Sequence, residues 1–190
     1  MGLPLNPFPS LTTRRSHRTD AAKLYGAIVA QARLPVFYQE LGVPDTLEGR
    51  FLVLSLHLFA VLQRLKAEGR SARGLAQALT DHFSADMETV LRELGVGDLS
   101  IPKKMRTLAA QSASLSEALE RAAARGEKAV AAVLDGALPS DQNLSEAASG
   151  QLAHYLKEAV QNLEAQSVAS LGAGEVRFPA PEEYWHDEGR

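Results

Sequence analysis

The sequence predicts an all-α protein, a single-domain helical bundle around a buried central helix, with flexible N- and C-terminal tails. Alanine and leucine dominate the composition, whereas the β-branched and aromatic residues that favour strands are sparse. Apolar residues recur at spacings of three and four along most of the chain. One segment, Leu47 to Leu65, is apolar on nearly every side, so other helices must surround it.

Composition restricts the possible functions. The chain has 190 residues, of which 45% are hydrophobic and 23% charged, and its formal net charge is -3. This length suffices to bury one core, and the negative charge argues against specific nucleic-acid binding. Because the sequence contains no cysteine, disulfides, zinc-thiolate sites and iron–sulfur clusters are excluded. We expect no cofactor.

Capping and breaking residues define the helices of the first half of the chain. Asp20 is a suitable N-cap for the first of them. Pro35 ends that helix, and Gly42 stops the short helix that follows. Asp45 with Glu48 forms a capping-box pattern, which predicts the start of the central helix.

Capping and helix-breaking residues also define the helices of the second half. Gly95 is a fitting C′ residue for a helix that starts near Ser71. Ser114 with Glu117 predicts the start of an alanine-rich helix, with a break at Gly126. A last helix is expected over residues 144–171.

These helices define the expected domain limits. A flexible basic tail is predicted over residues 1–19, a helical domain over 20–171 and a second flexible tail over 172–190. The longest uncharged apolar run, Phe51 to Gln63, is shorter than the about 20 residues of a membrane span, so none is expected. The N-terminus lacks the apolar core of a secretory signal. The expected location is the cytoplasm, or the inner face of the cytoplasmic membrane.

No pattern in the sequence is typical of catalysis, since glycine-rich phosphate loops and nucleophile elbows are absent. His82 and Asp86 are four residues apart on one helix face and could hold a metal. We favour the alternative, a histidine satisfied by a nearby carboxylate. His57 is interpreted as a hydrogen-bonded core histidine in preference to a haem or metal ligand. No catalytic or metal-binding residue is therefore predicted.

Two segments are candidates for partner binding. An aromatic pair in the short helix could help to form a groove for an apolar helix, although such residues more often fill a core. Three cations at the start of a later helix oppose the helix dipole there and could face an anionic partner. The alternative is a solvated face. The candidate residues are Phe37, Tyr38, Leu41, Lys103, Lys104 and Arg106.

Two runs of the sequence resemble a known family. They are YQELGVPDTLEGRFLVLSLHLFAVLQRL, from Tyr38 to Leu65, and LAQALTDHFSADMETVLRELGVGDLSIPKK, from Leu75 to Lys104. Both are similar to the chaperone family of ubiquinol–cytochrome c reductase, the bc1 complex. The most specific part is the pattern D-M-x-x-x-L-R-E-L-G-V-G-D-L-x-(I/V)-P-K, which starts at Asp86.

The resemblance implies a non-enzymatic assembly chaperone that binds newly made cytochrome b, or another bc1 subunit, and promotes assembly of the complex. Mitochondrial members work with a small partner protein and contact the ribosome, whereas this sequence looks like the shorter bacterial form. A ribosome or an anionic membrane surface is therefore a further expected partner. The alternatives are a helical adaptor peripheral to the membrane and, less favoured, a metal-binding enzyme that uses His82 and Asp86.

Overall fold

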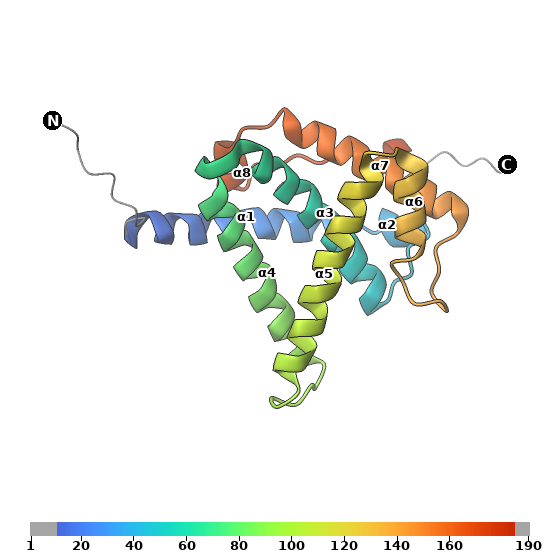
Figure 1. Ribbon diagram of the computed structural model, residues 1–190, viewed down its shortest axis with the longest axis horizontal. Coiled ribbons are helices and arrows are strands. Elements are labelled where there is room, and N and C mark those ends of the chain that lie inside the picture. Colours follow the sequence, from blue (N-terminus) through green and yellow to red (C-terminus); the bar gives the residue numbers. More distant parts are fainter. Residues whose placement is uncertain (1–10, 185–190) are drawn as a thin grey trace.

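The structure, a computed structural model, describes residues 11–184 (Figure 1). These residues form eight α-helices and two short 3-10 helices, without a strand among them, which confirms the all-α class. The α-helices are α1 (Leu11–Ala32), α2 (Val36–Gln39), α3 (Leu47–Glu68), α4 (Arg73–Glu93), α5 (Ile101–Ala123), α6 (Glu127–Asp135), α7 (Glu146–Glu164) and α8 (Val168–Ala173). The 3-10 helices are η1 (Gly69–Ser71) and η2 (Pro181–Tyr184).

Helix α3 is the predicted central helix. It packs against α1, α4 and α7. Four consecutive residues in its middle, Leu58 to Val61, are all buried. Four residues exceed one helical turn of 3.6 residues, so no side of the helix faces water there. The other helices are arranged around it, and α4 and α5 form a V whose tip projects from the rest of the molecule (Figure 1).

Helix α3 is capped by Thr46, not by the predicted Asp45. The Thr46 hydroxyl accepts a hydrogen bond from the Gly49 N–H at 3.2 Å. Thr46 has the extended backbone of an N-cap, with φ -117° and ψ 172°. Asp45 instead forms an ion pair with Arg50 at 2.6 Å. The cap is therefore displaced by one residue from the prediction.

The turn that leads into α3 leaves no room for a side chain at position 49. A Cβ atom added to Gly49 would lie 2.0 Å from the carbonyl oxygen of Pro44. The obstacle is backbone, so it cannot rotate away as a flexible side chain would. Glycine at this position therefore allows the chain to approach α3 closely.

A buried polar network joins α1, α3 and α7. The Nδ1 atom of His57 lies 2.8 Å from the Val53 carbonyl oxygen. Because a carbonyl oxygen only accepts, Nδ1 carries the proton and donates it to this bond. Nε2 then accepts from the Tyr155 hydroxyl at 2.8 Å, and the Gln31 amide donates to the same hydroxyl oxygen at 3.1 Å. His57 is thus the hydrogen-bonded core histidine that the sequence analysis favoured.

Aromatic rings surround His57. The ring centroids of Phe37 and Phe178 lie 5.3 Å and 4.9 Å from that of the imidazole, and that of Tyr155 lies at 5.5 Å. Burial among these rings penalises the charged imidazolium and lowers the pKa of His57 to about 4. The histidine is therefore neutral at physiological pH, as its two hydrogen bonds require.

The N-terminal boundary differs from the prediction. Helix α1 begins at Leu11, whereas a flexible tail was expected over residues 1–19. The early part of α1 packs closely on α4, because a Cβ atom added to Gly74 would lie 2.6 Å from the ring of His17. Because Gly74 has no side chain, the early part of α1 can lie directly against α4. Residues 1–10 lie outside the described part.

The C-terminal boundary also differs from the predicted tail over residues 172–190. Helix α8 continues to Ala173. The buried side chain of Gln166 then accepts a hydrogen bond from the Arg177 N–H at 2.9 Å and donates one to the Arg177 carbonyl at 2.6 Å. These bonds hold the next residue, Phe178, against His57. Residues 185–190 lie outside the described part.

Two helix limits in the second half are corrected. Helix α5 runs without interruption through Ser114, so the capping pattern predicted there does not start a helix. The last helix, expected over 144–171, is divided in two, because Ser167 caps α8 by accepting from the Ser170 N–H at 3.1 Å. The predicted break at Gly126 is present, where φ is 98°.

We expect Gly49→Ala to lower the free energy of unfolding by about 2 kcal/mol or more, because the added methyl group would collide with backbone. Gly26→Ala is the matched control. Gly26 lies within α1 with no atom within 4 Å of an added Cβ, so this change should raise stability by up to about 1 kcal/mol. Urea unfolding followed by circular dichroism measures both, and equal stabilities would contradict the close approach.

We expect His57 to make stability depend on pH. Its pKa of about 4 in the folded protein is below that of an unfolded histidine, about 6.5. Its contribution is therefore complete above pH 6.5 and is lost between about pH 6.5 and pH 4, by up to about 1.4 kcal/mol per pH unit.

Urea unfolding at pH 7 and pH 5 tests this dependence. His57→Gln should flatten the fall in stability between the two pH values, whereas His82→Gln, a change at an exposed histidine, should leave it as in the parent. An identical fall in all three proteins would assign the dependence to other groups.

Candidate partner-binding groove

A groove of about 890 Å³ lies between α3 and the V of α4 and α5, with the ends of α1 and α6 beside it. Most of its lining is apolar and comes from five helices and the turn after α6. The apolar lining residues are Val29, Ala32, Leu47, Phe51, Leu52, Leu54, Met87, Val90, Leu91, Leu94, Leu108, Leu115, Ala118, Val133, Ala137, Leu138 and Pro139.

The groove leaves large apolar side chains uncovered. Leu47, at the start of α3, is 50% exposed, and Leu94, just after α4, is 57% exposed. Phe51, Leu54 and Val90 are half-buried between them. Isolated exposed leucines are common on protein surfaces, whereas apolar side chains gathered in a concave surface are typical of binding sites.

Charged groups lie at one edge of the groove. Arg50 pairs with Asp45 at 2.6 Å and lies over the ring of Tyr38, 5.2 Å from its centroid. The Tyr38 hydroxyl donates to the Ala32 carbonyl at 2.7 Å. A tyrosine hydroxyl is protonated at neutral pH and can donate, and partial burial raises the pKa of Tyr38 further. This edge can therefore orient polar groups while the groove itself remains apolar.

The predicted partner-binding residues of the short helix, Phe37, Tyr38 and Leu41, lie partly in the core and partly in the groove. Phe37 and Leu41 are 0% and 1% exposed, so they cannot contact a partner in this structure. Phe37 instead packs against His57 and Tyr155. The alternative weighed in the sequence analysis, that the segment fills the core, applies to these two residues. Tyr38 alone of the three lines the groove.

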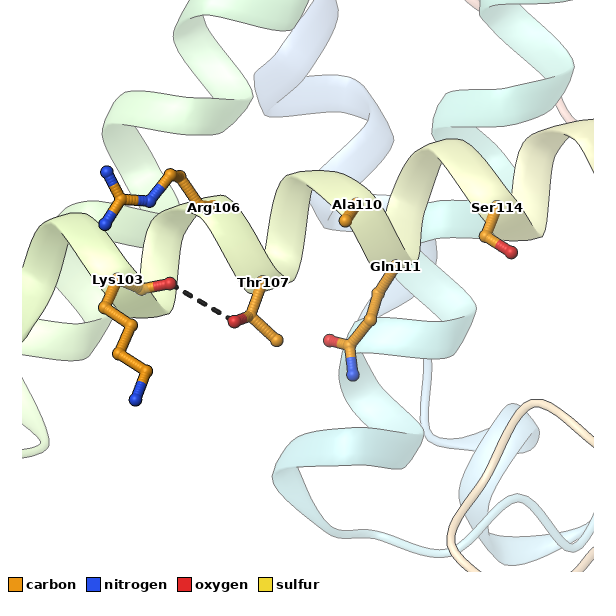
Figure 2. A pocket seen from close by; sticks show the side chains of 6 residues that line it. All are labelled: Lys103, Arg106, Thr107, Ala110, Gln111 and Ser114. Atoms are coloured by element: carbon orange, nitrogen blue, oxygen red, sulfur yellow. Dashed lines mark hydrogen bonds between the residues drawn. The ribbon is translucent and has the colours of Figure 1, made fainter.

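The predicted cations Lys103, Lys104 and Arg106 are exposed on the first turns of α5. Lys103 and Arg106 border a shallow depression of about 500 Å³ along this helix (Figure 2). There the Thr107 hydroxyl donates to the Lys103 carbonyl at 3.2 Å. Gln111 lines both this depression and the groove, so the basic surface and the apolar groove adjoin.

His82 and Asp86, the residues of the metal-site alternative, both contact Tyr25. The Tyr25 hydroxyl donates to an Asp86 carboxylate oxygen at 2.7 Å, and the His82 ring packs 5.0 Å from the Tyr25 ring. Burial and the Asp86 carboxylate raise the pKa of Tyr25 above its usual range, which keeps the hydroxyl protonated. In residues 11–184, no three His, Cys, Asp or Glu side chains gather where they could hold a metal ion.

The sequence analysis missed the groove residues on α4. The spacing of Leu75, Leu79 and Phe83 predicts one apolar face, and these side chains are buried. Met87, Val90, Leu91 and Leu94 continue the same spacing of three and four, and they line the groove. Because the spacing is the same along the whole stripe, it does not distinguish the part that other helices cover from the part that lines the groove.

No helix within the described residues combines the length and hydrophobicity needed to cross a membrane.

Comparison with known sequences points to one family. A family model described as ubiquinol-cytochrome C chaperone matches residues 39–178. The chain is 27% identical over 88 residues to ubiquinol-cytochrome-c reductase complex assembly factor 1 of Xenopus laevis. This match covers 46% of this chain and 44% of that protein. The chain is 28% identical over 85 residues to the Homo sapiens protein of that name, covering 45% of this chain and 28% of the human protein. The matches thus span less than half the length of these relatives.

A solved structure extends the similarity to most of the fold. The crystal structure of the Cbp3 homolog from Brucella abortus superposes with a TM-score of 0.77 at 33% identity. The superposition covers 89% of this chain and 93% of that one. The family match includes α3 to α8 and therefore most of the groove lining, apart from the residues of α1 and Tyr38. The chain belongs to the ubiquinol–cytochrome c chaperone family.

Proposed function

We propose that this protein is an assembly chaperone of the bc1 complex and that it binds newly made cytochrome b in the groove. The observation that carries the proposal is the uncovered apolar groove between α3 and the V of α4 and α5. In this proposal the protein acts by binding alone, without catalysis or a cofactor. Family membership supports the role, and two matched relatives are named as assembly factors of the reductase complex.

The chemistry of the groove suits an apolar helix. A membrane-spanning helix presents about 20 apolar residues, which must be shielded from water before insertion. A helix can lie in a hydrophobic groove through anchors at every third or fourth position. Leu47 and Leu94, both largely exposed, provide apolar contacts at the start of α3 and just after α4.

The charged residues that line the groove have a separate role in the proposal. Arg33, Glu48, Arg50 and Asp86 line it together with the apolar side chains. Such groups can contact the polar loops that flank a membrane helix and so fix its direction in the groove.

We expect Leu91→Glu with Leu94→Glu to reduce binding of cytochrome b by at least about tenfold. Burying an unpaired carboxylate under the client costs more than the ~1.4 kcal/mol that corresponds to a factor of ten. The measurement is the amount of cytochrome b that co-purifies with the tagged protein, together with bc1 activity of the membranes. The control is Ala123→Glu, at an exposed position at the end of α5 that does not line the groove.

Deletion of the gene tests the role without assuming the site. If cytochrome b levels and bc1 activity were unchanged in the deletion strain, the chaperone role would be rejected. If the groove variant bound cytochrome b as well as the parent does, while the deletion strain lost bc1 activity, the role would stand and the groove would be rejected as the client site.

A further inference from the structure

The tip of the V between α4 and α5 exposes a complete leucine side chain. Leu99 is 99% exposed, and Leu94 at the other side of the same turn is 57% exposed. The turn is tight, since the Ser100 N–H donates to the Gly97 carbonyl at 2.8 Å and Gly95 has a positive φ of 78°. The tip projects from the rest of the molecule, so no other described helix covers it (Figure 1).

Cations follow directly behind the exposed leucine. Lys103, Lys104 and Arg106 are exposed on the first turns of α5, and none of them forms an ion pair with a residue in the described range. No aspartate or glutamate occurs from Leu99 to Ser116. A positive surface thus occurs on a chain whose formal net charge is -3.

The acidic residues of the tip lie on the α4 side. Arg92 pairs with Glu88 at 2.6 Å and lies 3.8 Å from Asp98, so its single positive charge is shared between two of the three carboxylates there. Glu93, the third, is the last residue of α4 and is exposed. The α4 side therefore remains negative, whereas the positive charge without an ion-pair partner in the described range lies on α5, which begins two residues after Leu99.

We propose that this tip docks the protein on an anionic lipid bilayer, with Leu99 inserted among the acyl chains and Lys103, Lys104 and Arg106 at the headgroups. An apolar residue in front of a basic cluster is the arrangement that binds membrane interfaces, by apolar burial and by attraction to anionic lipid. A polyanion such as RNA would account for the cations but leaves Leu99 in water. The combination therefore favours a bilayer.

Docking at the tip would also orient the groove. Leu94 belongs to both the tip and the groove lining. A tip held at the membrane surface would thus bring the end of the groove near Leu94 to the headgroup layer. This inference goes beyond the proposed chaperone role and does not depend on the identity of the client.

The contribution of charge can be tested with the purified full-length chain and vesicles. We expect it to sediment with vesicles of phosphatidylcholine and phosphatidylglycerol but not with phosphatidylcholine alone, and increasing salt should weaken the binding. Lys103→Gln/Lys104→Gln/Arg106→Gln should bind roughly a hundredfold more weakly, since each cation near an anionic surface contributes about a fivefold increase in affinity. The control Arg70→Gln/Arg73→Gln/Lys128→Gln has the same net charge but changes exposed cations away from the tip, and it should bind like the parent.

Insertion of residue 99 needs a separate measurement. Because the chain lacks cysteine, Leu99→Cys can carry a single environment-sensitive fluorophore. We expect its emission to shift to the blue on anionic vesicles, whereas a label at Ser71→Cys, beyond the opposite end of α4, should not shift. Leu99→Ser should weaken the binding that remains at high salt.

Two results would overturn the proposal. One is binding to vesicles with no blue shift at position 99, which would leave only electrostatic adsorption. The other is binding of ribosomal RNA through the same three cations without binding of vesicles. Neither result would affect the proposed chaperone role, because these measurements contain no client.

Discussion

The bundle depends on one buried imidazole and the three elements that satisfy it. Burying a polar group costs free energy unless the group is hydrogen-bonded. His57 on α3 meets this condition through its own helix and through the hydroxyl of Tyr155 on α7, which in turn accepts from Gln31 on α1. The network therefore fixes the rotation of α3 relative to two neighbours, which apolar packing alone would leave less specific. The segment around Phe178 completes the aromatic enclosure.

The groove follows from the arrangement around this centre. Helix α4 packs on α1, and α5 packs on α6, so the two arms of the V are held by different parts of the bundle. Their separation leaves the apolar residues of α3 near Phe51 and Leu54 uncovered. A rigid centre beside an open apolar surface suits a protein that holds a partner for a time and then releases it. Leu52 and Met87 belong both to the buried core and to the groove lining, so the groove is continuous with the core.

Local patterns in the sequence were enough for the helical class and for the central helix, because a helix from Leu47 to Leu65 that is apolar on nearly every side must be surrounded by others. They were also enough for the breaks at Gly95 and Gly126, where a positive φ requires glycine. They failed at Ser114, since a serine inside a helix and a serine at its start look alike when tertiary contacts are unknown. They also did not separate Phe37, which is buried, from Tyr38, which lines the groove.

The groove itself was beyond sequence reasoning for a physical reason. Its existence depends on the angle between α4 and α5, and that angle is set by contacts of each arm with other helices. No periodicity within one helix encodes such an angle. The apolar stripe that continues through Val90, Leu91 and Leu94 shows only that this face is apolar, not whether another helix covers it.

The enclosure of His57 has a consequence for the order in which the molecule matures. Its contributors are far apart along the chain, since Gln31 donates both to Tyr155 and, at 3.5 Å, to the carbonyl of Pro179. Chains are synthesised from the N-terminus, so the helices around α3 emerge well before the residues that seal it. The imidazole therefore stays accessible to water until residue 179 has been added. The final packing around α3 therefore follows the synthesis of α7 and of the segment around Phe178, because both supply rings that enclose the imidazole.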